Sequence, residues 1–129
     1  MKEMKKLPDA EFEIMKVVWA NDPPITTPEI MRLLGHEKAW KIQTVVSLML
    51  RLTERGFLRS EKHGKERTYF PLVEKEDYLR FETGKFLKQF HDNSLFNFVA
   101  TLYDGGTLEE DEIDELIQLA KARGKTGDR

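Results

Sequence analysis

Hydrophobic residues in the first third of the chain recur every three or four positions, which is the spacing of amphipathic helices. Residues 9–20, DAEFEIMKVVWA, predict a first helix with Asp9 as its N-cap, and two prolines follow its end. Residues 25–35, ITTPEIMRLLG, predict a second helix capped by Thr27. Two helices are therefore expected before residue 36.

A third helix is predicted over residues 41–55, and its polar side differs from that of an ordinary surface helix. Its hydrophobic stripe consists of Ile42, Val45, Leu48, Met49 and Leu52. Its other side carries Lys41, Gln43, Thr44, Ser47 and Arg51, with Val46 and Leu50 among them. Solvated helix faces are usually rich in Glu and Lys, whereas this face has short uncharged groups that can form hydrogen bonds. It is a candidate for contact with a partner, although a mildly polar solvated face has the same pattern.

Residues 57–73 alternate between hydrophobic and polar positions on both sides of 63–65, which predicts a two-stranded hairpin. Gly56 before the hairpin and Gly64 in its turn can both adopt a positive φ. Basic side chains gather near the tip, namely Arg59, Lys62, Lys65 and Arg67. These residues suit contact with phosphates, although charged residues on a hairpin often serve solubility alone.

The helical pattern returns after residue 73. Three further helices are predicted over residues 74–90, 93–104 and 107–123, with a Gly-Gly pair between the last two. The expected N-caps are Asp92 or Asn93 for the second of these helices and Thr107, with Glu110 as its capping-box partner, for the third.

The order of these elements predicts a mainly α protein with a small β wing. We expect an N-terminal winged helix-turn-helix domain over residues 1–74 and a C-terminal helical dimerisation domain over residues 75–129. A winged helix lays its third helix in the major groove, where Gln, Ser and Thr can bond base edges and Val can contact a thymine methyl group. The candidate contacts to double-stranded DNA are Lys41, Gln43, Thr44, Val46, Ser47, Arg51, Lys62, Lys65 and Arg67.

The net charge of −2 hides an uneven distribution. Residues 1–73 hold 13 basic and 10 acidic side chains, whereas residues 74–129 hold 8 and 13. Within residues 38–67 the balance is 8 basic to 3 acidic. A local basic patch can attract a polyanion, so the charge adds modest support to the DNA-binding hypothesis.

The last three predicted helices carry more aromatic and aliphatic residues than three thin helices can bury alone. The set comprises Tyr78, Phe81, Phe86, Phe90, Leu95, Phe98, Val99, Leu102, Ile113, Leu116 and Ile117. We expect this surface to form the shared core of a homodimer, because a dyad DNA site needs two reading helices one helical turn apart. The alternative is that the surface packs back onto the winged helix.

The residue types present exclude several other functions. The absence of cysteine excludes disulfides, thiolate metal sites and cysteine nucleophiles. The histidines, His36, His63 and His91, lie in different elements without metal-ligand spacing. The sequence contains no nucleophile elbow and no phosphate-binding glycine loop, so we expect neither an enzyme nor a cofactor. No hydrophobic run approaches the length of a membrane span and the start lacks a signal peptide, which indicates a cytoplasmic protein.

Over about 110 residues the sequence resembles the penicillinase and methicillin-resistance repressors of the BlaI/MecI type. The resemblance is carried by the order and spacing of DAEFEIMKVVWAN, AWKIQTVVSLMLRLTERGFL, KERTYFPLV, NSLFNFV and LEEDEIDEL. It implies a cytoplasmic homodimer that represses transcription from a dyad operator, in connection with antibiotic resistance. It also implies that the signal of a membrane sensor leads to proteolysis at an Asn-Phe bond in the dimerisation domain.

This chain departs from the family pattern at three places. Its one Asn-Phe pair, Asn97-Phe98, is the candidate cleavage bond, but it lies one residue earlier than the pattern places it when counted from NSL. The residues of the third helix are less polar than those of relatives, so the operator sequence is expected to differ. The paired cysteines of a copper-responsive branch are absent, which argues against a copper-thiolate switch.

Two other functions fit a winged helix. One is a protein-interaction adaptor, which would show no salt-dependent affinity for DNA. The other is a regulator that senses a small molecule, which would be stabilised thermally by some metabolite and would need no proteolysis.

Overall fold

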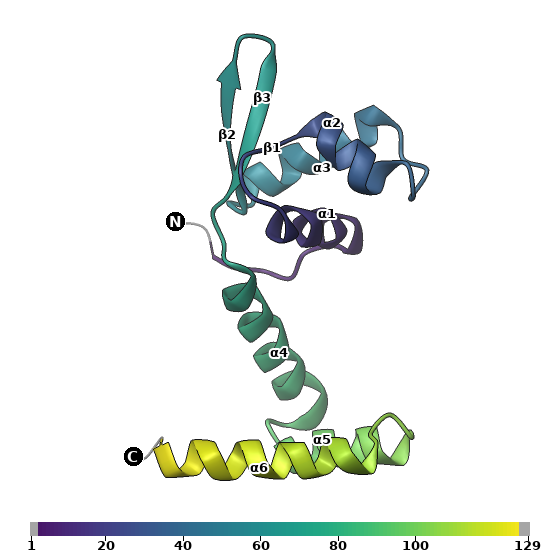
Figure 1. The fold of residues 1–129 in the computed structure, drawn as a ribbon, viewed down its shortest axis with the longest axis vertical. Helices are drawn as coiled ribbons and strands as arrows, with labels where there is room; N and C mark the ends of the chain where they lie inside the picture. The colour runs from purple at the N-terminus through teal and green to yellow at the C-terminus, as the bar shows by residue number, and fades with distance from the viewer. Residues whose placement is uncertain (1–2, 127–129) are drawn as a thin grey trace. The chain divides into compact units, whose positions relative to one another are not determined.

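The computed structural model describes residues 3–126, which fall into two compact units with the boundary between Glu82 and Thr83. Three helices and a small sheet form the first unit, and a hairpin projects from the helices (Figure 1). In chain order the elements of the first unit are α1 (Asp9–Ala20), β1 (Ile25–Thr26), α2 (Thr27–Ile30), the π-helical turn η1 (Met31–Gly35), α3 (Ile42–Glu54), β2 (Leu58–His63) and β3 (Glu66–Pro71). The helix α4 (Lys75–His91) begins in the first unit and ends in the second, which also holds α5 (Leu95–Asp104) and α6 (Glu110–Thr126).

The core of the first unit lies between its helices and the base of the hairpin. Its buried side chains include Ile14, Met15 and Val18 of α1 and Val45, Leu48, Met49 and Leu52 of α3. Leu58 of β2 and Tyr69 of β3 close the core from the side of the sheet. This packing leaves the opposite side of α3 to the solvent.

The N-terminal ends of α1 and α2 correct two predicted caps. Asp9 is the first residue of α1 rather than its N-cap. Pro8 occupies the N-cap position, and the carbonyl of Pro8 accepts the N–H of Phe12 at 3.0 Å. Thr26, not Thr27, caps α2. Its hydroxyl accepts the N–H of Glu29 at 3.3 Å, and the Glu29 carboxylate accepts the N–H of Thr26 at 2.9 Å. This reciprocal pair is a capping box.

The sheet has three antiparallel strands in the order β1-β3-β2, whereas we predicted two. The additional strand, β1, is only two residues long, and its Ile25 and Thr26 pair with Tyr69 and Thr68 of β3. The predicted hairpin is confirmed, and Gly64 in its turn has a φ of +66°.

The C-terminal end of α3 forms a Schellman motif. The N–H of Phe57 donates to the carbonyl of Leu52 at 2.9 Å, and the N–H of Gly56 donates to that of Thr53 at 3.1 Å. Gly56 has a φ of +84°, as predicted. At the other end of α3 the structure corrects one residue, because Ile42 is 42% exposed and does not belong to the buried stripe. At 100° per residue it falls about 70° from the centre of that stripe.

The first unit extends past residue 74, the predicted end of the winged-helix domain, because the first turns of α4 pack onto it. Tyr78 is buried there, and its hydroxyl accepts the N–H of Leu7 at 2.8 Å. Phe81 is also partly buried against this core. Both residues were predicted for the dimer surface, but Tyr78 is enclosed within its own unit and is not exposed to a second chain.

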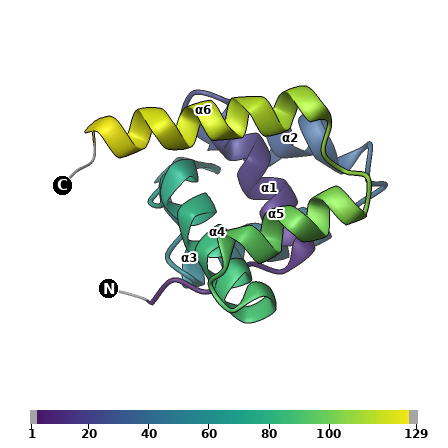
Figure 2. The ribbon, with the colours of Figure 1, turned by 90° about the horizontal axis from the view of Figure 1, so that it is seen from below.

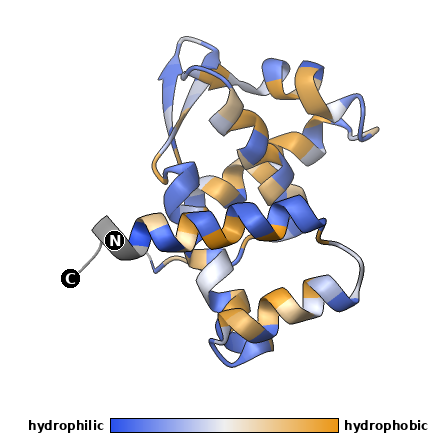
Figure 3. Cartoon of the chain, turned by 60° about the horizontal axis from the view of Figure 1, so that its bottom comes forward, coloured by the Kyte–Doolittle hydropathy of each residue, from blue (hydrophilic) through white to orange (hydrophobic). Residues whose placement is uncertain are grey.

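The second unit differs from the first because none of its side chains between residues 83 and 123 is buried. The helices α5 and α6 run in opposite directions on either side of the Gly105–Gly106 turn (Figure 2). Hydrophobic residues dominate α5 (Figure 3), and Leu95, Phe96 and Tyr103 of this helix are exposed. In the described part of the chain no helix is both long and apolar enough to cross a membrane.

The caps of α5 and α6 also differ from those predicted. Asp92 and Asn93 adopt left-handed conformations with φ of +50° and +63°, and Ser94 caps α5. The helix α6 begins at Glu110, so Thr107 lies outside it. The N–H of Glu109 donates instead to the carboxylate of Glu112 at 3.0 Å, which closes the first turn of α6.

Candidate nucleic-acid interface

The exposed side of α3 carries polar groups that have no partner within the described chain. Gln43, Thr44 and Ser47 are all exposed, and their side chains form no hydrogen bond with any residue between 3 and 126. Lys41, at the N-cap position, and Val46, between these residues, are exposed as well. The face therefore offers donors and acceptors that are free to bond a ligand from outside.

Arg51 lies near the C-terminal end of the same face. The sequence left open whether it pairs with Glu54 or Glu66, and neither pair forms among the described residues. Together with Glu3, Lys5, Glu54, Arg55 and Phe57, it lines a surface cavity of about 420 Å³. The lining carries both charge signs, so the cavity has no clear preference for an anion, and the guanidinium of Arg51 stays available to a phosphate.

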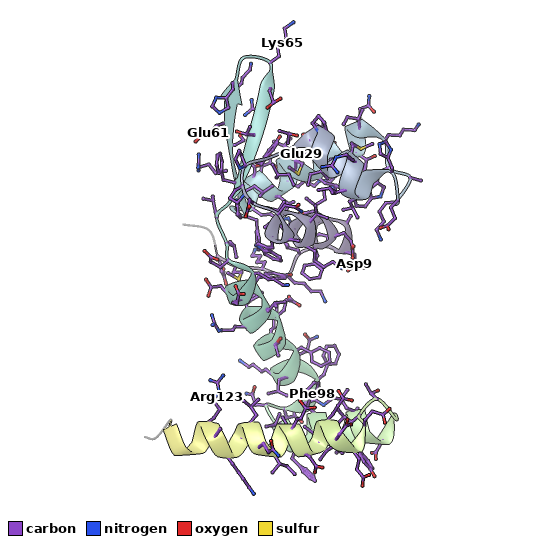
Figure 4. The ribbon with its side chains drawn as sticks, in the orientation of Figure 1. Asp9, Glu29, Glu61, Lys65, Phe98 and Arg123 are labelled. Atoms are coloured by element: carbon purple, nitrogen blue, oxygen red, sulfur yellow. The ribbon has the colours of Figure 1, made fainter. Side chains whose placement is uncertain are left out.

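The pairing register of the hairpin places two predicted phosphate contacts on one face. Lys62 lies opposite Arg67, and Ser60 lies opposite Tyr69, in the antiparallel register of β2 and β3. Residues directly opposite each other share a face of the sheet. Arg67 donates from Nη1 to the Ser60 hydroxyl at 2.9 Å, which holds the guanidinium along the strand. Lys65 extends from the tip of the hairpin (Figure 4).

The other face of the hairpin holds its charges in internal pairs. The guanidinium of Arg59 lies 4.2 Å from the centre of the Phe70 ring and forms an ion pair with Glu61. His63 also approaches Glu61, at 3.4 Å. The hydrogen bond from Arg59 is the main cause that lowers the pKa of Glu61 below its ordinary value. Arg59 is therefore less available to a phosphate than Lys62, Lys65 or Arg67.

A buried carboxylate holds the end of α3 against α1, and no sequence pattern indicates this contact. The Nε of Arg55 donates to Oε1 of Glu11 at 2.6 Å, and Glu11 is 1% exposed. Arg55 is the residue that follows α3 and precedes the turn at Gly56. The ion pair therefore fixes the position of α3 and the base of the hairpin relative to α1.

Comparison with known proteins identifies the family of this chain. A family model described as penicillinase repressor matches residues 7–122. The chain belongs to the penicillinase repressor family. The penicillinase repressor of Bacillus licheniformis is 32% identical over 119 residues, which cover 92% of each chain. The methicillin resistance regulatory protein MecI of Staphylococcus aureus (strain N315) is 28% identical over 115 residues, covering 88% of this chain and 92% of MecI.

Two solved structures resemble the first part of this member of the penicillinase repressor family. The DNA binding domain of the repressor BlaI matches with a TM-score of 0.54 and 35% identity, over 60% of this chain and 94% of that one. The monomeric form of Bacillus licheniformis BlaI in complex with the blaP half-operator matches with a TM-score of 0.50 at the same identity and coverage. The predicted winged-helix fold and the predicted family are both confirmed. The nine residues predicted to contact DNA are all exposed, and their contacts stay predictions.

The candidate cleavage bond of this penicillinase-repressor relative lies within regular helix. The N–H of Asn97 donates to the Ser94 hydroxyl at 3.0 Å, and its carbonyl accepts the Thr101 hydroxyl at 2.9 Å. The side chain of Asn97 meets Nδ1 of His91 at 2.6 Å. The ring of Phe98 lies 6.1 Å from that of Phe86, centre to centre. The bond between Asn97 and Phe98 is thus held by the first turn of α5.

Proposed function

We propose that the protein is a sequence-specific DNA-binding repressor that acts as a homodimer on a dyad operator. The observation that carries the proposal is the unpaired hydrogen-bonding face of α3 beside a basic hairpin. Gln43, Thr44 and Ser47 would bond base edges in the major groove. Lys62, Lys65 and Arg67 would contact phosphates and fix the register on the duplex. The relative BlaI, whose structure with a half-operator matches this chain, supports the same assignment.

The second unit would join two copies of the chain. Its predicted interface residues remain at least partly exposed, with Phe86, Phe90, Leu95 and Ile117 between 44% and 62% exposed. Hydrophobic side chains that find no burial within one chain favour association with another. A second copy with the same surface could bury them in an isologous interface and would place two α3 helices for a dyad site.

Loss of repression would follow cleavage in this second unit. The candidate cleavage site is the bond between Asn97 and Phe98. The candidate partner is a membrane protein that senses an antibiotic and whose signalling pathway includes a protease. Because that bond lies inside α5, a protease would need the first turn of the helix to open before it could bind the chain in extended form. Separation of the dimer would then remove one reading helix from the operator.

Selection of DNA from a random duplex pool by the purified full-length chain tests the proposal. We expect enrichment of a palindromic sequence, bound by two chains, with an affinity that falls steeply as salt is raised because bound phosphates release counterions. A folded protein that enriches no sequence would contradict the proposal and would favour an interaction adaptor. Enrichment of a non-palindromic site bound by one chain would refute the dimeric part alone.

A further inference from the structure

Three hydrophobic side chains form an exposed row along α3. Ile42, Val46 and Leu50 follow one another at intervals of four residues and are 42%, 49% and 57% exposed. Residues four apart lie on one ridge of a helix. At a rise of 1.5 Å per residue the row is about 12 Å long. The sequence pattern alone placed Ile42 in the core and gave Leu50 no role, so the continuity of the row became visible only in the structure.

The surroundings of the row identify the chemistry of its partner. No acidic residue occurs between residues 41 and 53, and the row runs beside the hydrogen-bonding groups of Gln43 and Ser47. Lys41 and Arg51 stand near the two ends of the helix. A surface that is apolar along one ridge, uncharged beside it and basic at its ends complements a polyanion that presents apolar groups between its phosphates.

We propose that this row contacts the C5-methyl groups of thymines in the major groove, so that Ile42 and Leu50 join Val46 in determining the base preference. The proposal rests on the DNA-binding function proposed above. The thymine methyl is the apolar group that base pairs offer in the major groove. With base pairs about 3.4 Å apart, a row of about 12 Å spans three to four of them. The preferred half-site should therefore hold thymines at neighbouring positions along the track of this ridge.

Replacement of single thymines by deoxyuridine tests this contact, because the exchange removes the methyl group and leaves every hydrogen-bonding group in place. The selected duplex is resynthesised with one exchange at a time, and the affinity of the full-length protein is measured by fluorescence anisotropy. Burial of one methyl group contributes on the order of 0.8 kcal/mol, so each contacted position should lose about fourfold in affinity. Exchange of a thymine that the ridge does not contact should leave the affinity unchanged.

Variants of the row then assign each methyl group to a side chain. In Leu50→Ala the penalty for one exchange should disappear while the penalties at the other positions persist. Val46→Ala and Ile42→Ala should each abolish a different penalty. Leu72→Ala is the matched control, because Leu72 lies in the same unit outside α3 and is also 57% exposed. Ile42, Val46 and Leu50 are all exposed, so these variants should unfold at nearly the wild-type temperature.

The outcomes separate this proposal from the one on which it rests. If the protein selects an operator but no exchange of thymine for deoxyuridine weakens binding, the methyl contacts are refuted and the repressor function stands. The same conclusion follows if penalties occur but are unchanged in Leu50→Ala, Val46→Ala and Ile42→Ala. If no DNA sequence is selected, both proposals are refuted.

Discussion

Arg55 and Glu11, 44 residues apart in the chain, meet in an ion pair of 2.6 Å that joins the end of α3 to α1. The carboxylate is almost fully buried, whereas the arginine side chain is 38% exposed. Removal of the arginine would leave a buried charge without its partner, which is more costly than loss of the attraction alone. The pair therefore affects both the stability of the first unit and the orientation of α3.

Arg55→Met should lower the free energy of unfolding by about 2 kcal/mol, because the buried Glu11 carboxylate loses its hydrogen-bond partner. Chemical denaturation at fixed protein concentration measures the change. Arg80→Met is the matched control, since Arg80 pairs with Asp77 on an exposed helix surface and such pairs contribute at most about 1 kcal/mol. Equal losses in the free energy of unfolding would show that the pair of Arg55 and Glu11 stabilises the protein no more than an exposed ion pair does.

Thr26→Ala should destabilise the protein by about 1 kcal/mol, because the variant loses the side-chain half of the capping box of α2. Thr27→Ala provides a control at the next residue, where the hydroxyl caps no helix, and it should change stability by less than about half as much. Thermal unfolding of the two variants side by side distinguishes them. A larger loss in Thr27→Ala would contradict the assigned cap.

Stability should fall at alkaline pH through Tyr78. Burial raises the pKa of its phenol above the ordinary value of about 10, while the bond from the N–H of Leu7 opposes that shift. The unfolded chain then loses the proton at lower pH than the folded one, so the contribution of this group to stability is full below pH about 10 and declines above it. Tyr78→Phe should flatten this decline relative to wild type in unfolding measured against pH. If stability declines as steeply in Tyr78→Phe as in the wild type, groups other than Tyr78 cause the decline.

Leu95→Glu should shift the protein from dimer towards monomer in sedimentation at micromolar concentration, because it places a charge on the proposed interface of the second unit. Glutamate at the first position of α5 is compatible with the helix, so a loss of helix is not expected. Leu72→Glu is the control, with a leucine that is 57% exposed against 58% for Leu95. Wild-type association of Leu95→Glu would refute this interface.

The parts of the fold that depend on nearby residues could be predicted from the sequence. Periodicity located the helices, and Gly56 and Gly64 marked the turns because both need a positive φ. The strand β1 was missed because two residues have no period, and its pairing with β3 joins segments more than 40 residues apart. The cap of α2 was placed one residue late, although the spacing of Thr26 and Glu29 is that of a capping box and distinguishes Thr26 from Thr27.

The candidate site could also be predicted only in part. The unusual polarity of α3 was visible in the sequence because burial of Val45, Leu48, Met49 and Leu52 defines the opposite face. The sequence did not show that Ile42 escapes burial, because neighbouring elements decide how much of the helix face is covered. The pair of Arg59 and Glu61 was also missed, although the two residues lie two positions apart on one face of β2. The link between Glu11 and Arg55 has no sequence pattern.

If α3 reads bases while the hairpin holds the backbone, substitutions in the two elements should act differently on the ratio of affinities for the selected operator and for random DNA. At one salt concentration, Gln43→Ala should lose roughly 1–3 kcal/mol of affinity for the operator and little for random DNA, so the ratio falls. Lys65→Ala should weaken binding to both DNAs about equally and leave the ratio unchanged. A ratio that is unchanged in Gln43→Ala and reduced in Lys65→Ala would contradict the assignment.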